Sequence, residues 1–179
     1  MASFIRTIHT DVWEHMFPLN SLGKVFYMFL LTCTATSETS VFYFPVRYPA
    51  MYLNLENKEA ELLIRDFESK GLVSYDWGTE EILVRYYFSN HSPIGGITYE
   101  MYAKDLAKVR SSVLLNELKE HSQNFKVSVA FYAALADFYP ELEDEAMMKR
   151  YKINWGKTPT LAAARAAAAK GRAAAASST

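Results

Sequence analysis

The chain has 179 residues, of which half are apolar and 15% aromatic, and its formal net charge is −1. This composition excludes a disordered protein, and the length predicts one domain, or one domain with a smaller appendage. The single cysteine, Cys33, excludes an internal disulfide, and the most apolar run, residues 25–33, is much shorter than the ~20 residues of a membrane span. Because the N-terminal stretch also lacks the apolar core of a signal peptide, we expect a cytoplasmic protein that does not enter a membrane.

Helical spacing and capping residues predict two helices at the start of the chain. The first covers residues 11–16 and ends before Pro18, because the residue preceding a proline disfavours the helical conformation. The second covers residues 21–32 and begins at an Asn20 or Ser21 cap. Four apolar residues of this helix have the spacing of a buried stripe: Val25, Phe26, Phe29 and Leu30.

A short strand and two further helices follow. Residues 41–44 predict a strand, and the prolines after it predict a short helix over 45–53. The clearest helix covers residues 55–69, with Asn54 as a plausible N-cap and an apolar side at helical spacing. Gly71 stands where a left-handed residue would end this helix.

A β-hairpin is expected over residues 72–88, with its turn at Gly78. Apolar and polar residues alternate in its second half, as a strand requires. Residues 93–97 then predict a linker, because they combine a proline with a pair of glycines.

Three helical segments are predicted beyond the linker. The first is one long helix over residues 98–121, the second covers 125–139 and ends at Pro140, and a final piece covers 141–155. The tail, residues 158–179, is alanine-rich with sparse Arg and Lys. Two explanations of the tail stay open: a frayed alanine helix, or a stretch that is not native.

The order of these elements is that of a winged helix-turn-helix, in which a hairpin follows the third helix of the motif. The expected fold class is therefore mainly α with a small β-hairpin (α+β), a winged helix-turn-helix followed by additional helices. We expect a winged-helix domain over residues 1–92, the linker over 93–97, a helical extension over 98–157 and the tail over 158–179.

A resemblance to a known family is carried by three stretches: DVWEHMFPLNSLGKVFYMFLLT, LNLENKEAELLIRDFESKGLVSYD and ILVRYYFSN. They resemble the N-terminal winged-helix domain of phage replisome organisers, which are replication initiators related to the bacterial protein DnaD. The resemblance covers about residues 8–118 and consists of hydrophobic and turn positions. It implies a role in DNA replication, with DNA and a helicase or its loader as partners.

The helix in the recognition position departs from this pattern in its charge. A helix that reads DNA is usually rich in Arg, Lys, Asn and Gln, because phosphates repel acidic groups. Between residues 56 and 70 this chain has five acidic residues and three basic ones, and the hairpin adds three more acids. The sequence therefore does not predict that this helix enters a major groove.

Positive charge is concentrated outside the winged helix. Residues 1–97 carry seven basic and eleven acidic residues, residues 98–148 carry five and nine, and residues 149–179 carry seven basic residues and no acid. On a continuous helix, Lys104 and Lys108 share a face, and Arg110 lies less than a turn further round. A basic tail after an acidic body points to a polyanion. The candidate DNA contacts are Lys104, Lys108, Arg110, Lys149, Arg150, Lys152 and Lys157.

Consecutive rings in the second hairpin strand predict an interaction surface. Residues 86–88 are all aromatic, so both faces of the strand carry rings, whereas a small winged helix has one face to bury. We expect the other rings to contact the second domain or another subunit. The candidates for self-association in a homo-oligomer are Phe42, Phe44, Tyr86, Tyr87 and Phe88.

No pattern predicts catalysis. The histidines and Cys33 lack metal-ligand spacing, and neither a nucleophile motif nor a nucleotide fingerprint occurs. The acidic run over residues 141–145 is more typical of a solvated face than of a two-metal site. We therefore expect a non-enzyme with no cofactor.

Three functions remain open from the sequence. The first is a replication-initiation scaffold that self-associates through the winged helix and binds DNA through its basic segments. The second is a sequence-specific transcriptional regulator that reads DNA with the helix over residues 55–70. The third is a protein-interaction module with no nucleic-acid role.

Overall fold

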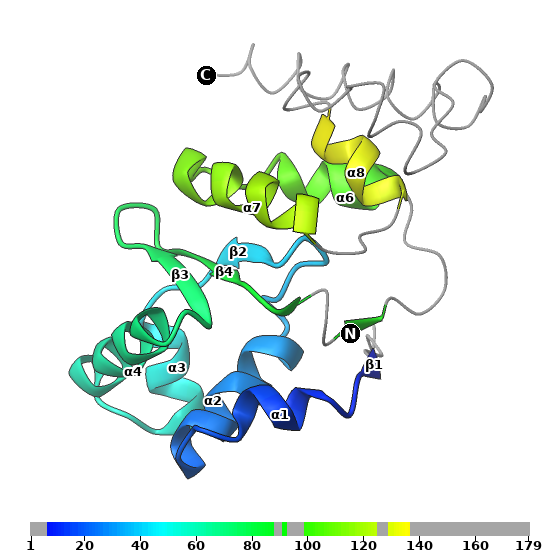
Figure 1. Cartoon of the computed structure of the whole chain (residues 1–179). Coiled ribbons are helices and arrows are strands. Elements are labelled where there is room, and N and C mark those ends of the chain that lie inside the picture. Colours follow the sequence, from blue (N-terminus) through cyan, green and yellow to red (C-terminus); the bar gives the residue numbers. More distant parts are fainter. Residues whose placement is uncertain (1–6, 88–90, 93–98, 125–128, 137–179) are drawn as a thin grey trace, which may run out of the picture. The chain divides into compact units, whose positions relative to one another are not determined.

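The computed structural model describes residues 7–87, 91–92, 99–124 and 129–136 (Figure 1). The chain forms two compact units, and it passes between them three times. Unit 1 contains Met1–Gly95 and Val109–Phe125, and unit 2 contains Gly96–Lys108 and Lys126–Thr179. The first crossing falls within the predicted linker over residues 93–97, but part of the predicted extension belongs to unit 1.

Unit 1 has the predicted order of elements around a three-stranded antiparallel sheet, in which β4 lies between β2 and β3. Together with unit 2, the described residues hold seven helices, so the predicted α+β, mainly helical fold class is confirmed. The winged-helix elements are α1 (Val12–Met16), α2 (Ser21–Thr32), β2 (Val41–Tyr43), α3 (Arg47–Leu53), α4 (Asn57–Ser69), β3 (Val73–Asp76) and β4 (Glu81–Val84).

Local signals in the sequence set several of these boundaries. The side chain of Asn20 accepts a hydrogen bond of 2.8 Å from the N–H of Gly23, so the predicted cap of α2 is confirmed. Gly71 has a φ of +67° just after α4, as predicted. Asn54 ends α3 in a left-handed conformation and does not begin α4. That helix begins at Glu56, which forms a capping box with Glu59.

Aromatic side chains form the core between the helices and the sheet. Phe26, Phe44 and Phe67 are fully buried, and the rings of Phe26 and Phe67 meet edge to face at 4.7 Å. The predicted buried stripe of α2 is partly wrong. Phe26 and Leu30 are buried, but Val25 is 54% exposed and Phe29 is half-buried.

The largest difference from prediction concerns the helix expected over residues 98–121. Two helices stand there, α6 (Tyr99–Leu106) in unit 2 and α7 (Ser112–Asn124) in unit 1. In unit 1, α7 packs against β2, β3 and β4, on the side of the sheet opposite α1–α4 (Figure 1). All four residues of β4 are therefore buried, and the hairpin does not have an open face.

Two further elements complete the described residues. A two-stranded antiparallel sheet pairs β1 (Thr7–Ile8) with β5 (His91–Ser92), which the sequence analysis did not predict. In unit 2, α6 packs against α8 (Val129–Ala136), and the rings of Tyr102 and Phe131 meet at 5.2 Å. Within the described residues, every helix is too short or too polar to cross a lipid bilayer. The final helical piece, the tail and the predicted linker lie outside the described residues.

Candidate functional site

The recognition-position helix α4 and the β3–β4 wing form the candidate site. Apolar residues of α4 face the core, and Ala60, Ile64 and Phe67 are completely buried. The opposite side of α4 is exposed, and Leu62 in its middle is 59% exposed. Helical spacing places Leu62 between two rows of acidic residues, one formed by Glu59 and Asp66 and the other by Glu61 and Glu68.

Two of the three basic side chains between residues 56 and 70 are engaged by neighbouring groups. The guanidinium of Arg65 donates to the carboxylate of Glu61 at 2.8 and 3.0 Å, and it lies 4.1 Å from the centroid of the Trp77 ring. Lys70 forms an ion pair with Asp66 one turn earlier. Arg65 and Lys70 are therefore paired with acidic residues of α4.

The wing closes onto the same helix through Trp77. Its indole N–H donates to Glu68 at 3.3 Å, and Glu68 also accepts from the backbone N–H of Tyr75 at 3.1 Å. The ring centroids of Tyr75 and Trp77 lie 4.5 Å apart with their planes tilted by 59°, and burial raises the pKa of Tyr75 well above its ordinary value. Trp77 thus fills the space between wing and helix and covers Arg65.

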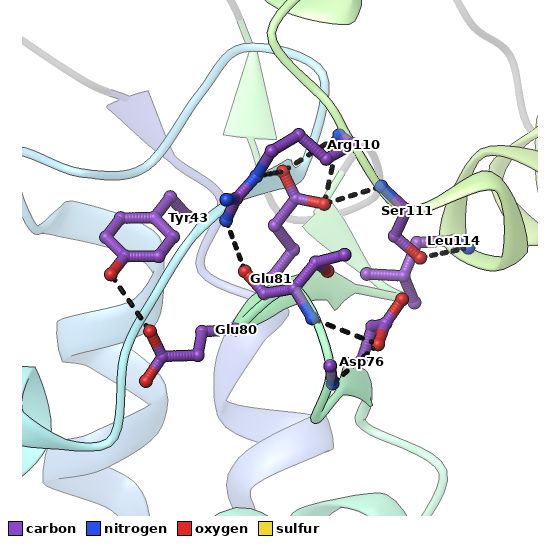
Figure 2. A network of polar contacts seen from close by, with 9 residues as sticks. Tyr43, Asp76, Glu80, Glu81, Arg110, Ser111 and Leu114 are labelled. Atoms are coloured by element: carbon purple, nitrogen blue, oxygen red, sulfur yellow. Dashed lines mark hydrogen bonds and ion pairs between the residues drawn. The ribbon is translucent and has the colours of Figure 1, made fainter.

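A polar network fixes the other side of the wing to the start of α7 (Figure 2). The carboxylate of Glu81 is 2% exposed, and it accepts hydrogen bonds from the backbone N–H groups of Arg110, at 3.0 and 3.1 Å, and of Ser111, at 2.7 Å. The guanidinium of Arg110 lies 3.7 Å from the same carboxylate and donates to the carbonyl of Thr79. The Ser111 hydroxyl accepts from the N–H of Leu114 and so caps α7.

Two more groups at the wing tip belong to this network. Asp76 accepts from the backbone N–H groups of Gly78 and Thr79, and a hydrogen bond from the Ser111 hydroxyl is the main reason that the pKa of Asp76 lies below its usual range. Tyr43 donates to Glu80 at 3.0 Å, and this bond raises the pKa of Tyr43. These contacts connect the wing tip to β2 and to the start of α7.

The network also explains why the predicted long helix is two helices. The N–H groups of residues 110 and 111 bond to Glu81, so they are not available to the carbonyls one turn earlier in the chain. Ser111 then starts a new helix as its N-cap. Glu81 was counted by the sequence analysis only as an acid of the wing.

The predicted basic edge depended on one continuous helix over residues 98–121, and two helices stand there instead. Lys104 is exposed on α6, and Lys108, beyond the end of α6, pairs with Asp105 at 2.7 Å. Arg110 belongs to unit 1 and is bound to Glu81. The remaining candidates lie outside the described residues: Lys149, Arg150, Lys152 and Lys157.

Most candidates for self-association are interior. Phe42, Phe44 and Tyr87 are at most 5% exposed, and Tyr86 is half-buried with its ring stacked on His15 at 4.6 Å. Phe88 lies outside the described residues. The expectation that these rings face a partner is corrected. Phe42, Phe44 and Tyr87 are buried within the protein, and Tyr86 packs against His15 of α1.

A different set of apolar side chains is exposed on the winged helix. Trp13 of α1 is 61% exposed, and Phe17, the C-cap residue of this helix, is 85% exposed. The opposite positions Val12 and Met16 are buried, so α1 is apolar on both sides. The sequence could have predicted a second apolar side of this helix, because Trp13 and Phe17 are four residues apart and each follows one of the buried residues, Val12 and Met16. Further exposed apolar residues lie on α2 and α3: Leu22, Val25, Met51 and Tyr52.

No group of His, Cys, Asp and Glu within the described residues could hold a metal ion.

The chain was compared with protein-family models, with curated proteins and with solved structures. None of the three comparisons found a match.

Proposed function

We propose that the protein is a scaffold for the initiation of DNA replication, of the kind that phage replisome organisers represent. In this proposal it works in the cytoplasm, self-associates through its winged helix, binds DNA through basic segments outside the winged helix, and recruits a helicase or its loader. The observation that supports it best is the acidic outer face of α4, where Trp77 and Glu61 engage Arg65.

This observation argues against groove reading by α4. Residues 56–70 contain three basic and five acidic residues, a net charge of −2, and the phosphates of DNA repel such a surface. An arginine that reads guanine needs its planar guanidinium free to form two hydrogen bonds with the base. Reading DNA with Arg65 would require loss of both the Glu61 pair and the Trp77 contact.

The basic residues after the last acid of the chain suit phosphate binding instead. The segment 149–179 has seven basic residues and no acid, so no neighbouring acid along the chain offsets its positive potential. Lys104, exposed on α6, adds a further positive charge. Contacts of this kind position a protein on DNA without reading its sequence.

The exposed apolar side chains of α1 support self-association. Scattered exposed apolar residues are ordinary, but two large aromatic rings one turn apart, 85% and 61% exposed, are typical of a contact surface. We assign the second copy of this chain as the partner of Trp13 and Phe17. Symmetric association of identical chains is the commonest form of oligomer.

A salt-dependent binding experiment on the full chain tests the DNA contacts. The triple substitution Lys149→Ala, Arg150→Ala and Lys152→Ala should weaken binding to all sequences alike. It should also flatten the salt dependence by about 2–3 units in log–log slope. The matched control is Lys58→Ala with Arg65→Ala, which removes charge from α4 and should leave binding unchanged.

Other outcomes identify the alternatives. If the α4 variant loses binding while the triple variant keeps it, the protein reads DNA with its winged helix as a transcriptional regulator does. If the unmodified chain binds no DNA at low salt, the protein is an interaction module without a nucleic-acid role.

A further inference from the structure

The exposed side of α2 and α3 carries a second apolar surface, in addition to the rings of Trp13 and Phe17. Leu22 and Val25, three residues apart on α2, are 40% and 54% exposed, and Met51 and Tyr52 of α3 are 67% and 60% exposed. The two helices meet here, because the ring centroids of Phe29 and Tyr52 lie 5.2 Å apart. The α2–α3 apolar surface consists of Leu22, Val25, Phe29, Met51 and Tyr52.

The charged residues of the three helices are divided by sign. With its N-cap, α1 carries two acids, Asp11 and Glu14, and neither Lys nor Arg. In contrast, α2 and α3 carry two bases, Lys24 and Arg47, and no acid. In the part of the chain that the structure describes, none of these side chains forms an ion pair, so their charges are available to a partner.

We infer that α1 of one copy of the chain packs on the α2–α3 apolar surface of a second copy. In this contact Trp13 and Phe17 cover the apolar side chains of the second copy, and the acids beside them meet its bases. Helical spacing supports the pairing, because Glu14 shares a side of α1 with Phe17, and Arg47 shares a side of α3 with Met51. Apolar surfaces rimmed by charge of opposite sign are typical of protein contacts.

The contact closes as a symmetric dimer. In each chain α1 packs against α2, so the two surfaces belong to neighbouring elements. A two-fold axis between the copies then forms the same contact twice, and neither surface is left open. The inference rests on the self-association in the proposed function, and it names the surface that the rings of α1 meet.

Charge reversal in the full chain tests the pairing. One variant reverses α1 with Asp11→Lys and Glu14→Lys, and another reverses α2 and α3 with Lys24→Glu and Arg47→Glu. Each variant alone places like charges across both contacts, so its scattering mass at high micromolar concentration should fall toward that of one chain. An equimolar mixture should return to the mass of two chains, because every contact again joins opposite charges. A chain with all these reversals should also form a dimer.

The control is Lys58→Glu, which reverses an exposed base of α4 outside both surfaces and should leave the mass unchanged. If the variant reversed on α2 and α3 keeps the mass of two chains, the rings of α1 meet a different surface and the inference is wrong. It is also wrong if both the mixture and the fully reversed chain stay at the mass of one chain.

A variant without charge changes covers the case in which a reversal unfolds the chain, as circular dichroism would show. Val25→Ser alters a side chain that is 54% exposed, so the fold should tolerate it and the mass should fall. An unchanged mass would contradict the pairing. A one-chain mass for the unmodified protein would instead remove self-association from the proposed function, and this result is visible before any substitution is made.

Discussion

The buried carboxylate of Glu81 accepts a 2.7 Å hydrogen bond from the backbone N–H of Ser111, thirty residues further along the chain. This bond joins the central strand of the sheet to the start of α7. A carboxylate at a helix N-terminus is stabilised by the unpaired N–H groups there and by the helix dipole. The contact makes α7 part of the winged-helix unit, and it ends the preceding helix.

Glu81→Gln should destabilise the protein. The substitution removes the charge and presents an amide donor toward N–H groups that then lack an acceptor. We expect a loss of about 1–3 kcal/mol in the free energy of unfolding, measured by urea denaturation. The matched control is Glu80→Gln, next in sequence but exposed, which should stay within about 0.5 kcal/mol of the unmodified protein. Equal losses would contradict a specific role for the buried carboxylate.

Asp76→Asn should change how stability depends on pH. The pKa of Asp76 in the folded protein is lower than its ordinary value of 3.8, so the ionised form stabilises the fold above that pH. This contribution is lost as pH falls through the folded pKa. The variant should therefore be less stable than the unmodified protein at pH 6, and the difference should shrink as pH falls below 3.8. A difference that stays constant between pH 6 and pH 2.5 would contradict this assignment.

Phe17→Ser should weaken self-association without affecting the fold. Phe17 is 85% exposed, so its removal costs little packing within the chain. The scattering mass of the full chain at high micromolar concentration should fall toward that of one chain. Val113→Ser, at a similarly exposed position on α7, should leave the mass unchanged. A one-chain mass for the unmodified protein would rule out self-association in this concentration range.

Gly71→Ala should cost more stability than Gly71→Asn. The φ of +67° at Gly71 is strained for any residue with a Cβ atom, but asparagine adopts it more readily than alanine. The nearest atom to an added Cβ is Nη1 of Arg85 at 3.8 Å, so crowding does not interfere with the comparison. We expect a loss of about 1 kcal/mol for alanine and less for asparagine, by thermal unfolding. The reverse order would show that the side chain, and not the backbone angle, decides the cost.

Local signals in the sequence determined most of the winged helix. Asn20 and the polar stretch after Thr32 set both ends of α2, because capping groups and breakers act within a few residues. The left-handed Gly71 and the hairpin turn near Gly78 were predicted for the same reason. The segregation of charge, with an acidic helix in the recognition position and a basic C-terminal segment, is likewise a property of the sequence.

Only the tertiary structure decided which surfaces are open. The burial of Phe42, Phe44 and Tyr87 depends on packing between segments far apart in the chain, which periodicity does not report. The division between α6 and α7 depends on Glu81, whose carboxylate reaches residues 110 and 111 only after the sheet has formed. The contact between the Arg65 guanidinium and the Trp77 ring likewise depends on the folded chain, because Trp77 belongs to the wing and Arg65 to α4. A sequence pattern records the character of each residue, whereas exposure and pairing arise from contacts that the folded chain makes between distant residues.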